Sequence, residues 1–371
     1  MAPFRIIIVG GGIAGFTAAI ALRATGRQII ILEQSSLNKE IGALISLQPN
    51  AARIAGLEWK LEQNFLKAQQ MVDEGFRIYN TDGDLVRTIP LATKDKYGAE
   101  RLLFHRKDLH EALKKAAISP ERAGDPVAVR VSCRVLECDA FCGTVTLEGG
   151  EVVKGDLIIG ADGIHSVLRK HVVEDNPNPI PTGHSAYRLM VPTEILEREE
   201  PEFCAKINPR EPFTSIIVAH NCRLIMGPGR QGEVYGIVAL VPDEQMTEDP
   251  ALKQSWVSEG NIEKMLETFR EFPSWVKNIF RHSPDLGLWQ LRDMDPLANW
   301  YCGRVILIGD AAHAMLPTQG QGASQAIEDS EALGSFLKDI HESPALDDLI
   351  NILEVSGFAL KGKFSFGAGN D

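Results

Sequence analysis

Residues 4–33 read FRIIIVGGGIAGFTAAIALRATGRQIIILE. The apolar, β-branched run at 4–9 predicts a buried strand, and the alanine-rich stretch at 16–25 predicts a helix. A second apolar run at 28–32 predicts another buried strand, which ends at Glu33. This order of elements is a βαβ unit, which is the building block of α/β folds with a parallel sheet.

Three glycines lie between the first predicted strand and the helix, and they occupy the positions of a GxGxxG pattern. Gly10 allows a tight turn, Gly12 lets the backbone approach a pyrophosphate, and Gly15 lets the helix pack closely on the strand. Glu33 closes the second strand, where an acid can accept hydrogen bonds from both hydroxyls of an adenosine ribose. We therefore expect a dinucleotide site; the alternative is a glycine-rich turn without a ligand.

A second motif, VILIGDAAHAMLPTQGQGASQAIED, spans residues 305–329. It predicts a short buried strand at 305–308, then the carboxylate of Asp310, then a helix within 319–336 that Gly320 and Gly322 open. An acid at a strand end suits a hydroxyl, and the free amides of a helix start suit an anion or an electron-rich ring edge. Taken alone, the motif is equally compatible with an ordinary strand–helix connection.

Two further stretches place polar groups beside glycines or helix starts. DLIIGADG at 156–163 predicts a buried strand that ends in Asp162 and Gly163. In LLFHRKDLHEAL at 102–113, Arg106 lies at a strand-to-helix corner, where a cation can meet a phosphate; its alternative is a surface salt bridge to Asp108.

The middle of the chain has the composition of antiparallel sheet. Alternating residues and glycine turns at 127–153 predict a β-meander. From residue 177 to 296, prolines become frequent and several β-like runs precede two predicted helices near 261–281. This region is expected to be an inserted, mainly antiparallel domain that covers a substrate.

Composition narrows the classes of function. The 371 residues carry a net charge of −12, which argues against nucleic acid or an anionic membrane as a main partner. The apolar runs are far shorter than the roughly 18 residues of a membrane span, and the first of them leads into glycines instead of a signal-peptide cleavage site. The six cysteines include no CxxC pair, which indicates a reducing, cytoplasmic location. Cys133, Cys138 and Cys142 are interpreted as buried thiols, and no metal site is expected.

Together, three separated motifs resemble the class A flavoprotein monooxygenases, the group of para-hydroxybenzoate hydroxylase and salicylate hydroxylase. They are GGGIAG with Glu33, GADG at 160–163, and GDAAH followed by PTQGQGASQAIED. The similarity covers residues 4 to about 337, and YRLMVP at 187–192 is most similar to the salicylate hydroxylase-like members.

The resemblance implies an α/β fold with a Rossmann-like FAD-binding domain and an inserted, mainly antiparallel β-sheet substrate domain. The expected divisions are 1–176 and 297–343 for the FAD-binding domain and 177–296 for the substrate domain. Residues 344–371 depart from the family pattern and are expected to form an atypical, shortened C-terminal tail, whose glycine-rich end is typical of disorder.

The resemblance also implies FAD as the cofactor, with NADPH or NADH as a transient co-substrate. The residues expected to bind the cofactor are Gly10, Gly12, Ile13, Ala14, Gly15, Glu33, Gln34, Gly42, Ala43, Arg106, Asp162, Gly163, Asp310, Pro317, Gly320, Gly322 and Ala323.

The implied reaction is hydroxylation of an aromatic or phenolic small molecule by O2 through a flavin C4a-hydroperoxide. Alternatives are an epoxidation, dearomatisation or Baeyer–Villiger-type oxidation of a secondary metabolite, or a flavin-binding protein with little turnover. Arg188 is the first candidate for activating the substrate, unless it lies on the outer face of its strand. His220 is the second, as a base or as a structural histidine. The expected assembly is a monomer or a homodimer.

Overall fold

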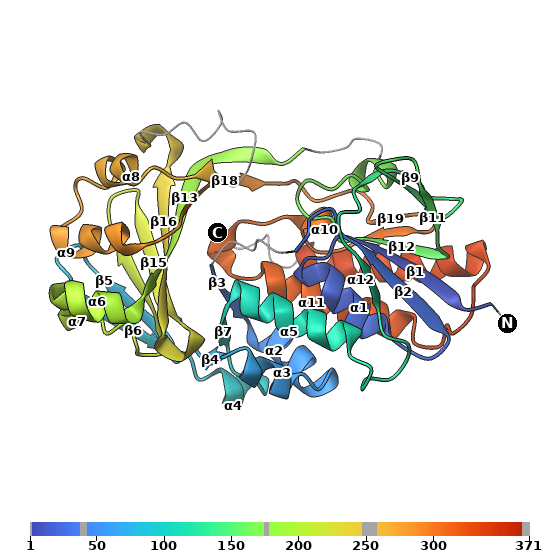
Figure 1. Cartoon of the computed structure of the whole chain (residues 1–371), viewed down its shortest axis with the longest axis horizontal. Coiled ribbons are helices and arrows are strands. Elements are labelled where there is room, and N and C mark those ends of the chain that lie inside the picture. Colours follow the sequence, from blue (N-terminus) through green and yellow to red (C-terminus); the bar gives the residue numbers. More distant parts are fainter. Residues whose placement is uncertain (1, 38–42, 174–177, 247–257, 366–371) are drawn as a thin grey trace.

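The first sheet is built around the N-terminal strand, in a computed structural model that describes residues 2–37, 43–173, 178–246 and 258–365 (Figure 1). Its strand order is β19-β20-β12-β1-β2-β8, and all neighbours are parallel except β19 and β20. The strands are β1 (Phe4–Val9), β2 (Arg27–Leu32), β8 (Ala128–Arg130), β12 (Leu157–Gly160), β19 (Tyr301–Cys302) and β20 (Val305–Leu307). Continuous apolar runs form these strands because both faces of a parallel sheet are buried.

Helices from both ends of the chain cover this sheet. α1 packs against α11 and α5, so the N-terminal helix contacts the helix that follows residue 320. The principal helices are α1 (Ile13–Leu22), α5 (Arg106–Ile118), α10 (Asp310–His313), α11 (Gly322–Phe336) and α12 (Leu346–Ser365). Smaller elements of this half are β3 (Leu44–Leu47), α2 (Pro49–Arg53), α3 (Glu62–Lys67), β4 (Met71–Val72), α4 (Thr93–Tyr97), β7 (Leu102–His105), β9 (Val135–Asp139), β10 (Thr144–Leu147) and β11 (Val152–Lys154).

A second sheet of eight strands forms the other half of the molecule, in the order β17-β18-β13-β16-β15-β14-β5-β6 (Figure 1). The strands are β5 (Gly75–Tyr79), β6 (Leu85–Pro90), β13 (Ile180–Pro192), β14 (Phe213–Val218), β15 (Arg223–Gly229), β16 (Val234–Pro242), β17 (Ser258–Glu259) and β18 (Leu286–Asp293). Its outer helices are α6 (Thr193–Glu199), α7 (Pro201–Lys206), α8 (Ile262–Thr268) and α9 (Ser274–Lys277). Alternate residues of β13 and β16, including Tyr187, Leu189 and Ile237, pack in the core beneath these helices.

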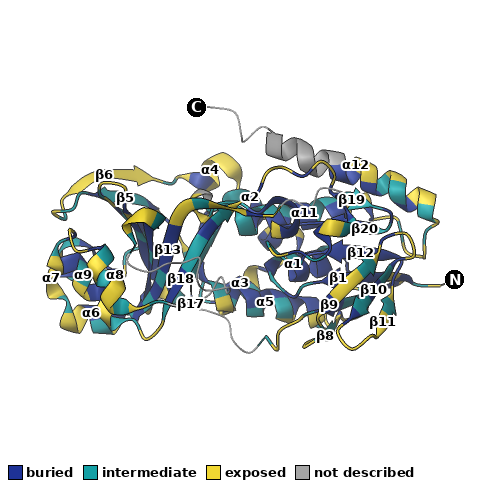
Figure 2. Ribbon diagram, turned by 90° about the horizontal axis from the view of Figure 1, so that it is seen from above, coloured by how far each residue is buried: buried dark blue, intermediate teal, exposed yellow. Residues whose placement is uncertain are grey.

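The α/β fold with an inserted antiparallel sheet is confirmed, but the predicted division at residue 177 omits two strands. β5 and β6 lie in the range assigned to the first domain, yet β5 pairs in parallel with β14 of the second sheet. β6 then forms the exposed outer edge (Figure 2). Every residue of β6 is exposed, although Leu85, Val86 and Ile89 are apolar, and its pairing depends on β5, which joins a strand about 140 residues later; local sequence pattern therefore could not assign the hairpin to a sheet.

Three smaller expectations are corrected. The predicted meander begins at β9, because residues 128–130 pair with β2 in the large sheet instead. Of the cysteines expected to be buried, Cys133 and Cys138 are half-buried and Cys142 is exposed; Cys133 precedes β9, Cys138 lies on β9, and Cys142 lies in the turn after it. The predicted C-terminal tail contains the helix α12 as far as Ser365, with Leu349 and Leu353 fully buried in the main core, whereas the rest of its glycine-rich end, 366–371, lies outside the described residues. Within the described residues, no helix has the length and apolarity that crossing a bilayer requires.

A buried ion pair joins the two halves. Asp73 is fully buried and pairs with the guanidinium of Arg101, which is 8% exposed. Thr214 of β14 donates a hydrogen bond to Asp73 Oδ2 at 2.7 Å, and Arg101 Nη2 donates to Ser46 Oγ of β3 at 3.2 Å. Desolvation lowers the pKa of Arg101 to about 10, so the side chain stays protonated at neutral pH.

We expect Asp73→Ala to leave a buried cation without its counter-ion and to lower the free energy of unfolding by about 3–5 kcal/mol. Urea unfolding followed by intrinsic fluorescence measures the loss. The double variant Asp73→Ala/Arg101→Met removes both charges and should recover most of it. Equal stability of the wild-type protein and Asp73→Ala would contradict this role for the pair.

Candidate active site

Three predicted motifs meet at one edge of the first sheet. β1, β12 and β20 are parallel neighbours, and their carboxyl ends lie at Val9, Gly160 and Leu307. The glycine turn, the Asp162-Gly163 turn and the Gly309-Asp310 turn therefore follow at the same edge. In open α/β sheets, ligands bind outside these carboxyl ends.

The glycine turn is closely packed on one side and open on the other. Gly10 has φ +106°, and a Cβ there would lie 2.3 Å from the carbonyl oxygen of Ala161. A Cβ at Gly15 would lie 1.9 Å from the carbonyl oxygen of Gly10, so the close packing of α1 on β1 requires glycine. A Cβ at Gly12 would meet nothing within 4 Å, and no side chain caps the start of α1. Ile13 and Ala14 open this helix, whose free amides face a space that a pyrophosphate can enter.

Glu33 is fixed at the end of β2. Its Oε2 accepts the Gly11 N–H at 2.6 Å and its Oε1 accepts the Ser35 N–H at 2.7 Å, while Gln34 beside it is exposed. A carboxylate offers about four acceptor positions, so each oxygen of Glu33 retains capacity for a ligand hydroxyl.

Asp310 and Arg106 share an electrostatic environment. Asp310 lies at the start of α10 and is accessible to solvent. The surrounding protein desolvates its carboxyl and thereby raises the pKa, although the attraction of His313 and Arg106 acts in the opposite direction. Arg106 opens α5 and its backbone N–H donates to the carbonyl of Ala43 at 2.8 Å. The structure thus brings Ala43, Arg106 and Asp310 into one region; Gly42 lies outside the described residues.

Asp162 organises its own turn. Its Oδ2 accepts the backbone N–H groups of Val167 at 2.7 Å and Leu168 at 3.1 Å. Its Oδ1 is buried and has no hydrogen-bond partner among the described residues. Desolvation raises the pKa of this carboxyl despite the hydrogen bonds that it accepts.

Arg169 begins a short helical turn, Arg169–His171, that follows the Asp162-Gly163 turn. The side chain is 2% exposed and links two of the motifs through their carbonyl groups. Its Nη1 donates to Ile164 at 3.0 Å, its Nε to Ala311 at 2.9 Å and its Nη2 to Asp310 at 3.1 Å. The RK pair in the sequence suggested exposure, and no local signal indicated acceptors about 140 residues away.

The buried carboxylate of Asp329 fixes the Gly309-Asp310 turn from the core side. Asp329 Oδ2 accepts the Gly309 N–H at 2.9 Å and bonds His313 Nε2 at 2.6 Å. Burial opposes protonation of His313, but the charge of Asp329 outweighs it, so the pKa of His313 is raised above 6.5. His313 therefore has a structural position at the strand–helix junction.

Gln48 positions the segment after Pro317, a role that no sequence motif indicates. Pro317–Gln319 forms one turn, Gly320 adopts a left-handed conformation, and Gly322 and Ala323 begin α11. Gln48 Nε2 donates to the Gly320 carbonyl at 3.1 Å, and its backbone N–H donates to Ser324 Oγ at 2.9 Å.

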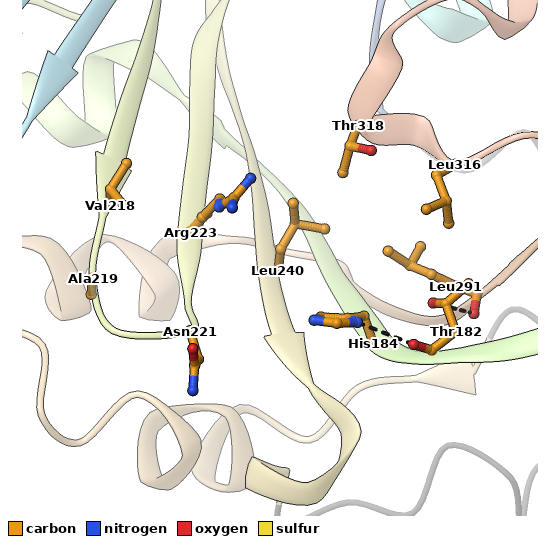
Figure 3. A pocket seen from close by; sticks show the side chains of 10 residues that line it. All are labelled: Thr182, His184, Val218, Ala219, Asn221, Arg223, Leu240, Leu291, Leu316 and Thr318. Carbon is orange, nitrogen blue, oxygen red and sulfur yellow. Dashed lines mark hydrogen bonds between the residues drawn. The ribbon is translucent and has the colours of Figure 1, made fainter. Parts of the chain in front are cut away.

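A pocket of about 310 Å³ lies between the second sheet and this segment (Figure 3). Its walls are mainly apolar on both sides, and a few polar side chains converge on it. The lining residues are Thr182, His184, Val218, Ala219, Asn221, Arg223, Leu240, Leu291, Leu316 and Thr318.

Arg188 lies on the inner face of the second sheet. It pairs with Val238 and Gly287, and its guanidinium lies 4.6 Å from the centre of the Trp289 ring. Desolvation, followed by repulsion from nearby Arg106, lowers the pKa of Arg188 to about 10. The outer-face alternative for Arg188 is therefore wrong.

The structure does not bring His220 to Arg188. His220 is exposed at the turn between β14 and β15, and its Nε2 lies 3.3 Å from Asn221 Nδ2. Its two neighbours in sequence line the pocket, whereas His220 does not. Because His220 is exposed and does not line the pocket, a role as the base is unsupported.

His313 predicts a pH dependence of stability. Because its folded-state pKa is raised, its ion pair with Asp329 contributes fully below about pH 6.5 and is lost as pH rises through the raised value. We expect His313→Gln to lower the thermal midpoint most in acid and least in alkali. Thermal unfolding of both proteins at a series of pH values tests this, and a pH-independent difference would contradict it.

Comparisons with known proteins agree with this geometry. Family models described as FAD binding domains match residues 5–40 and 139–352. Hispidin-3-hydroxylase of Neonothopanus nambi is 31% identical over 348 residues, which cover 90% of this chain and 80% of that protein. The 3-hydroxybenzoate 6-hydroxylase of Polaromonas naphthalenivorans is 32% identical over 345 residues, with 91% and 80% covered. A salicylate hydroxylase substrate complex superposes with a TM-score of 0.76 at 27% identity, covering 98% of this chain and 85% of that one.

The chain therefore belongs to the class A FAD-dependent monooxygenases, the family of salicylate hydroxylase, and FAD is its cofactor.

Proposed function

We propose that this monooxygenase hydroxylates a small aromatic or phenolic molecule, with NADPH or NADH and O2 as co-substrates. The main support for the proposal is the position of the pocket. Leu316 and Thr318, which flank Pro317 in the segment leading into α11, close one side of it. In the proposed arrangement, this same segment borders the flavin ring. A substrate in the pocket would then lie against the reactive face of the cofactor.

The described residues fit FAD. The open side of Gly12 and the free amides of α1 suit the pyrophosphate, and the anchored carboxylate of Glu33 suits the adenosine ribose. Asp310 and Arg106 suit the ribityl chain and the phosphates beside it, because they place one acid and one cation at the mouth of the same turn. The buried, partnerless Oδ1 of Asp162 is a further acceptor at this edge.

When bound, FAD supplies the redox chemistry, accepting a hydride from NAD(P)H and activating O2 for insertion of one oxygen atom. The chain's own residues supply position and polarity. The amino end of α11, a 15-residue helix without a side-chain cap, favours negative charge beside Gly320 and Gly322. The apolar walls formed by Leu240, Leu291 and Leu316 exclude water from the reacting groups.

Arg188 is the proposed activating residue. Its guanidinium contacts the Trp289 ring but makes no hydrogen bond or ion pair within the described ranges. A phenolic O–H near such a cation loses its proton more readily, because the positive charge stabilises the phenolate. A phenolate ring is more electron-rich and therefore more reactive toward an electrophilic oxygen.

We expect Arg169→Lys to weaken FAD binding roughly tenfold or more, because a lysine cannot reproduce the planar set of donors that joins the two turns. Fluorescence titration of the apoprotein with FAD measures the change. Arg304→Lys is the matched control: Arg304 also donates to a carbonyl, that of Asp156 at 2.9 Å, but lies at the opposite end of the strands. Equal FAD affinity in Arg169→Lys and the control would contradict the linking role.

The activity is tested with salicylate, 3-hydroxybenzoate, 3-amino-4-hydroxybenzoate and hispidin, each supplied with NADH or NADPH. We expect at least one to stimulate NAD(P)H oxidation and to gain one oxygen atom by mass spectrometry. Arg188→Ala should retain FAD and lose stimulated turnover by about 10²-fold, since it removes a cation that acts at the reacting group.

Arg198→Ala is the control for Arg188→Ala, because Arg198 is exposed on α6 and, among the described residues, pairs only with neighbouring Glu199 at 2.7 Å. Unchanged turnover in Arg188→Ala would remove this residue from the site. NAD(P)H consumption that yields only peroxide with every aromatic compound would contradict the proposed hydroxylation.

A further inference from the structure

His110 contacts the glycine turn from a neighbouring helix. It is 3% exposed and belongs to α5, which packs beside α1 (Figure 1). Its Nε2 lies 2.6 Å from the carbonyl oxygen of Gly11. A carbonyl oxygen can only accept a hydrogen bond, so Nε2 carries the hydrogen and donates it.

The imidazole of His110 is held in this orientation by the helices around it. Its ring packs edge-on against Phe16 of α1, with ring centres 5.1 Å apart and planes at 75°. His110 also lies four residues after Arg106, so both side chains share one face of α5. Through this face, α5 reaches the glycine turn with His110, while the charge of Arg106 acts on Asp310.

The glycine turn needs such contacts because its peptide planes are weakly determined by the sequence. Glycine adopts many backbone conformations at little cost, so a peptide between two glycines rotates more easily than others. Gly10–Gly11 and Gly11–Gly12 are two such peptides in succession. The N–H of the first donates to Glu33 Oε2 at 2.6 Å, and the carbonyl of the second accepts from His110. One side chain from another element therefore fixes each plane.

The hydrogen bond from His110 also determines where the Gly12 N–H points. In a trans peptide, the carbonyl and the N–H that follows it point in opposite directions, and the described residues contain no cis peptide bond. Because the Gly11 carbonyl faces His110, the Gly12 N–H faces away from it. Within the described ranges, this N–H donates to no acceptor, so it remains available beside the free amides of α1.

The reverse orientation of this peptide would oppose the binding of an anion. Rotation by half a turn would place the Gly11 carbonyl oxygen where the Gly12 N–H now points. The negative end of the peptide dipole would then face the phosphates instead of a donor. The rotation would also leave the buried Nε2 of His110 without this acceptor, which is costly.

We propose that His110 is a positioning residue for FAD: its hydrogen bond holds the Gly11–Gly12 peptide so that the Gly12 N–H donates to the pyrophosphate. In this arrangement His110 does not touch the cofactor and acts through the Gly11 carbonyl. The inference rests on the proposed placement of the pyrophosphate at this turn, and it is independent of which substrate is oxygenated.

Three ligands of the apoprotein test the assignment: FAD, ADP, which keeps the pyrophosphate, and riboflavin, which has no phosphate. Flavin fluorescence gives the Kd of FAD and riboflavin, and calorimetry gives that of ADP. His110→Phe keeps a planar ring and removes the donor. We expect it to raise the Kd of FAD and of ADP by a similar factor, roughly 10- to 100-fold, and to change that of riboflavin by less than about twofold.

His110→Gln is the rescue variant, because a glutamine Nε2 can donate to the same carbonyl; we expect a Kd for FAD within about fivefold of the wild-type value. His110→Asn, whose amide is too short to reach Gly11, replaces His110→Phe if the latter does not fold. His341→Phe is the matched control. His341 is exposed, and its Nδ1 lies 3.1 Å from the carbonyl of Thr25, in the loop before β2 at the opposite end of the strands.

Nuclear magnetic resonance observes the peptide directly. Glycine labelled with carbonyl 13C and with 15N isolates peptides between two glycines, of which the chain has three: Gly10–Gly11, Gly11–Gly12 and Gly149–Gly150. We expect FAD to shift the Gly11–Gly12 signal of the wild-type protein, because its N–H gains a charged acceptor. His110→Phe should shift it without FAD, because its carbonyl loses a donor. The signal of Gly149–Gly150, between β10 and β11, should not move.

Three results would overturn the role of His110: unchanged Kd values for FAD and ADP in His110→Phe, a loss for riboflavin equal to that for ADP, or no recovery in His110→Gln. The last would assign the effect to packing instead of the hydrogen bond. A Gly11–Gly12 signal that FAD leaves unmoved would show that the pyrophosphate binds elsewhere. Oxygenation of an aromatic compound would leave the proposed hydroxylation standing in each case.

Discussion

Parallel pairing of β1, β12 and β20 is the constraint on which the site depends. Parallel strands end at a common edge, so three turns that are 150 residues apart along the chain become neighbours. The pairing alone would leave flexible loops at that edge. Arg169 joins the turn after β12 to the turn after β20, because its planar donors reach carbonyl groups on both, and Asp329 holds the turn after β20 from the core side.

Charge is used differently in the two halves. At the sheet edge, the buried side chains of Arg169 and His313 bond defined partners. On the inner face of the second sheet, Arg223 lines the pocket and the guanidinium of Arg188 contacts the Trp289 ring. A buried group whose hydrogen bonds are all made within the protein rigidifies the structure around it, whereas a cation that faces a cavity can bind a ligand that accepts its hydrogen bonds. The division suits a protein in which a permanently bound cofactor meets exchanging small molecules.

Local patterns predicted much of this architecture, since a βαβ unit and a glycine turn depend on residues close in sequence. The β13–β16 strands and α11 were predicted for the same reason. Arg169 and Gln48 were missed because their roles depend on partners supplied by distant segments. His220 was overvalued because a sequence shows that a histidine is near a strand end, but not whether that position lines a pocket formed with a distant segment.

The β5–β6 hairpin has a consequence for biosynthesis. Phe213 pairs with Gly75, so the hairpin leaves the ribosome about 140 residues before the strand that it joins. Pairings this distant in sequence form slowly, and until then the strand edge of β5 that β14 later covers is exposed to chaperones and proteases. The second sheet is consequently no autonomous module: excised at its apparent boundaries, it would present β14 as a bare edge, with a tendency to aggregate.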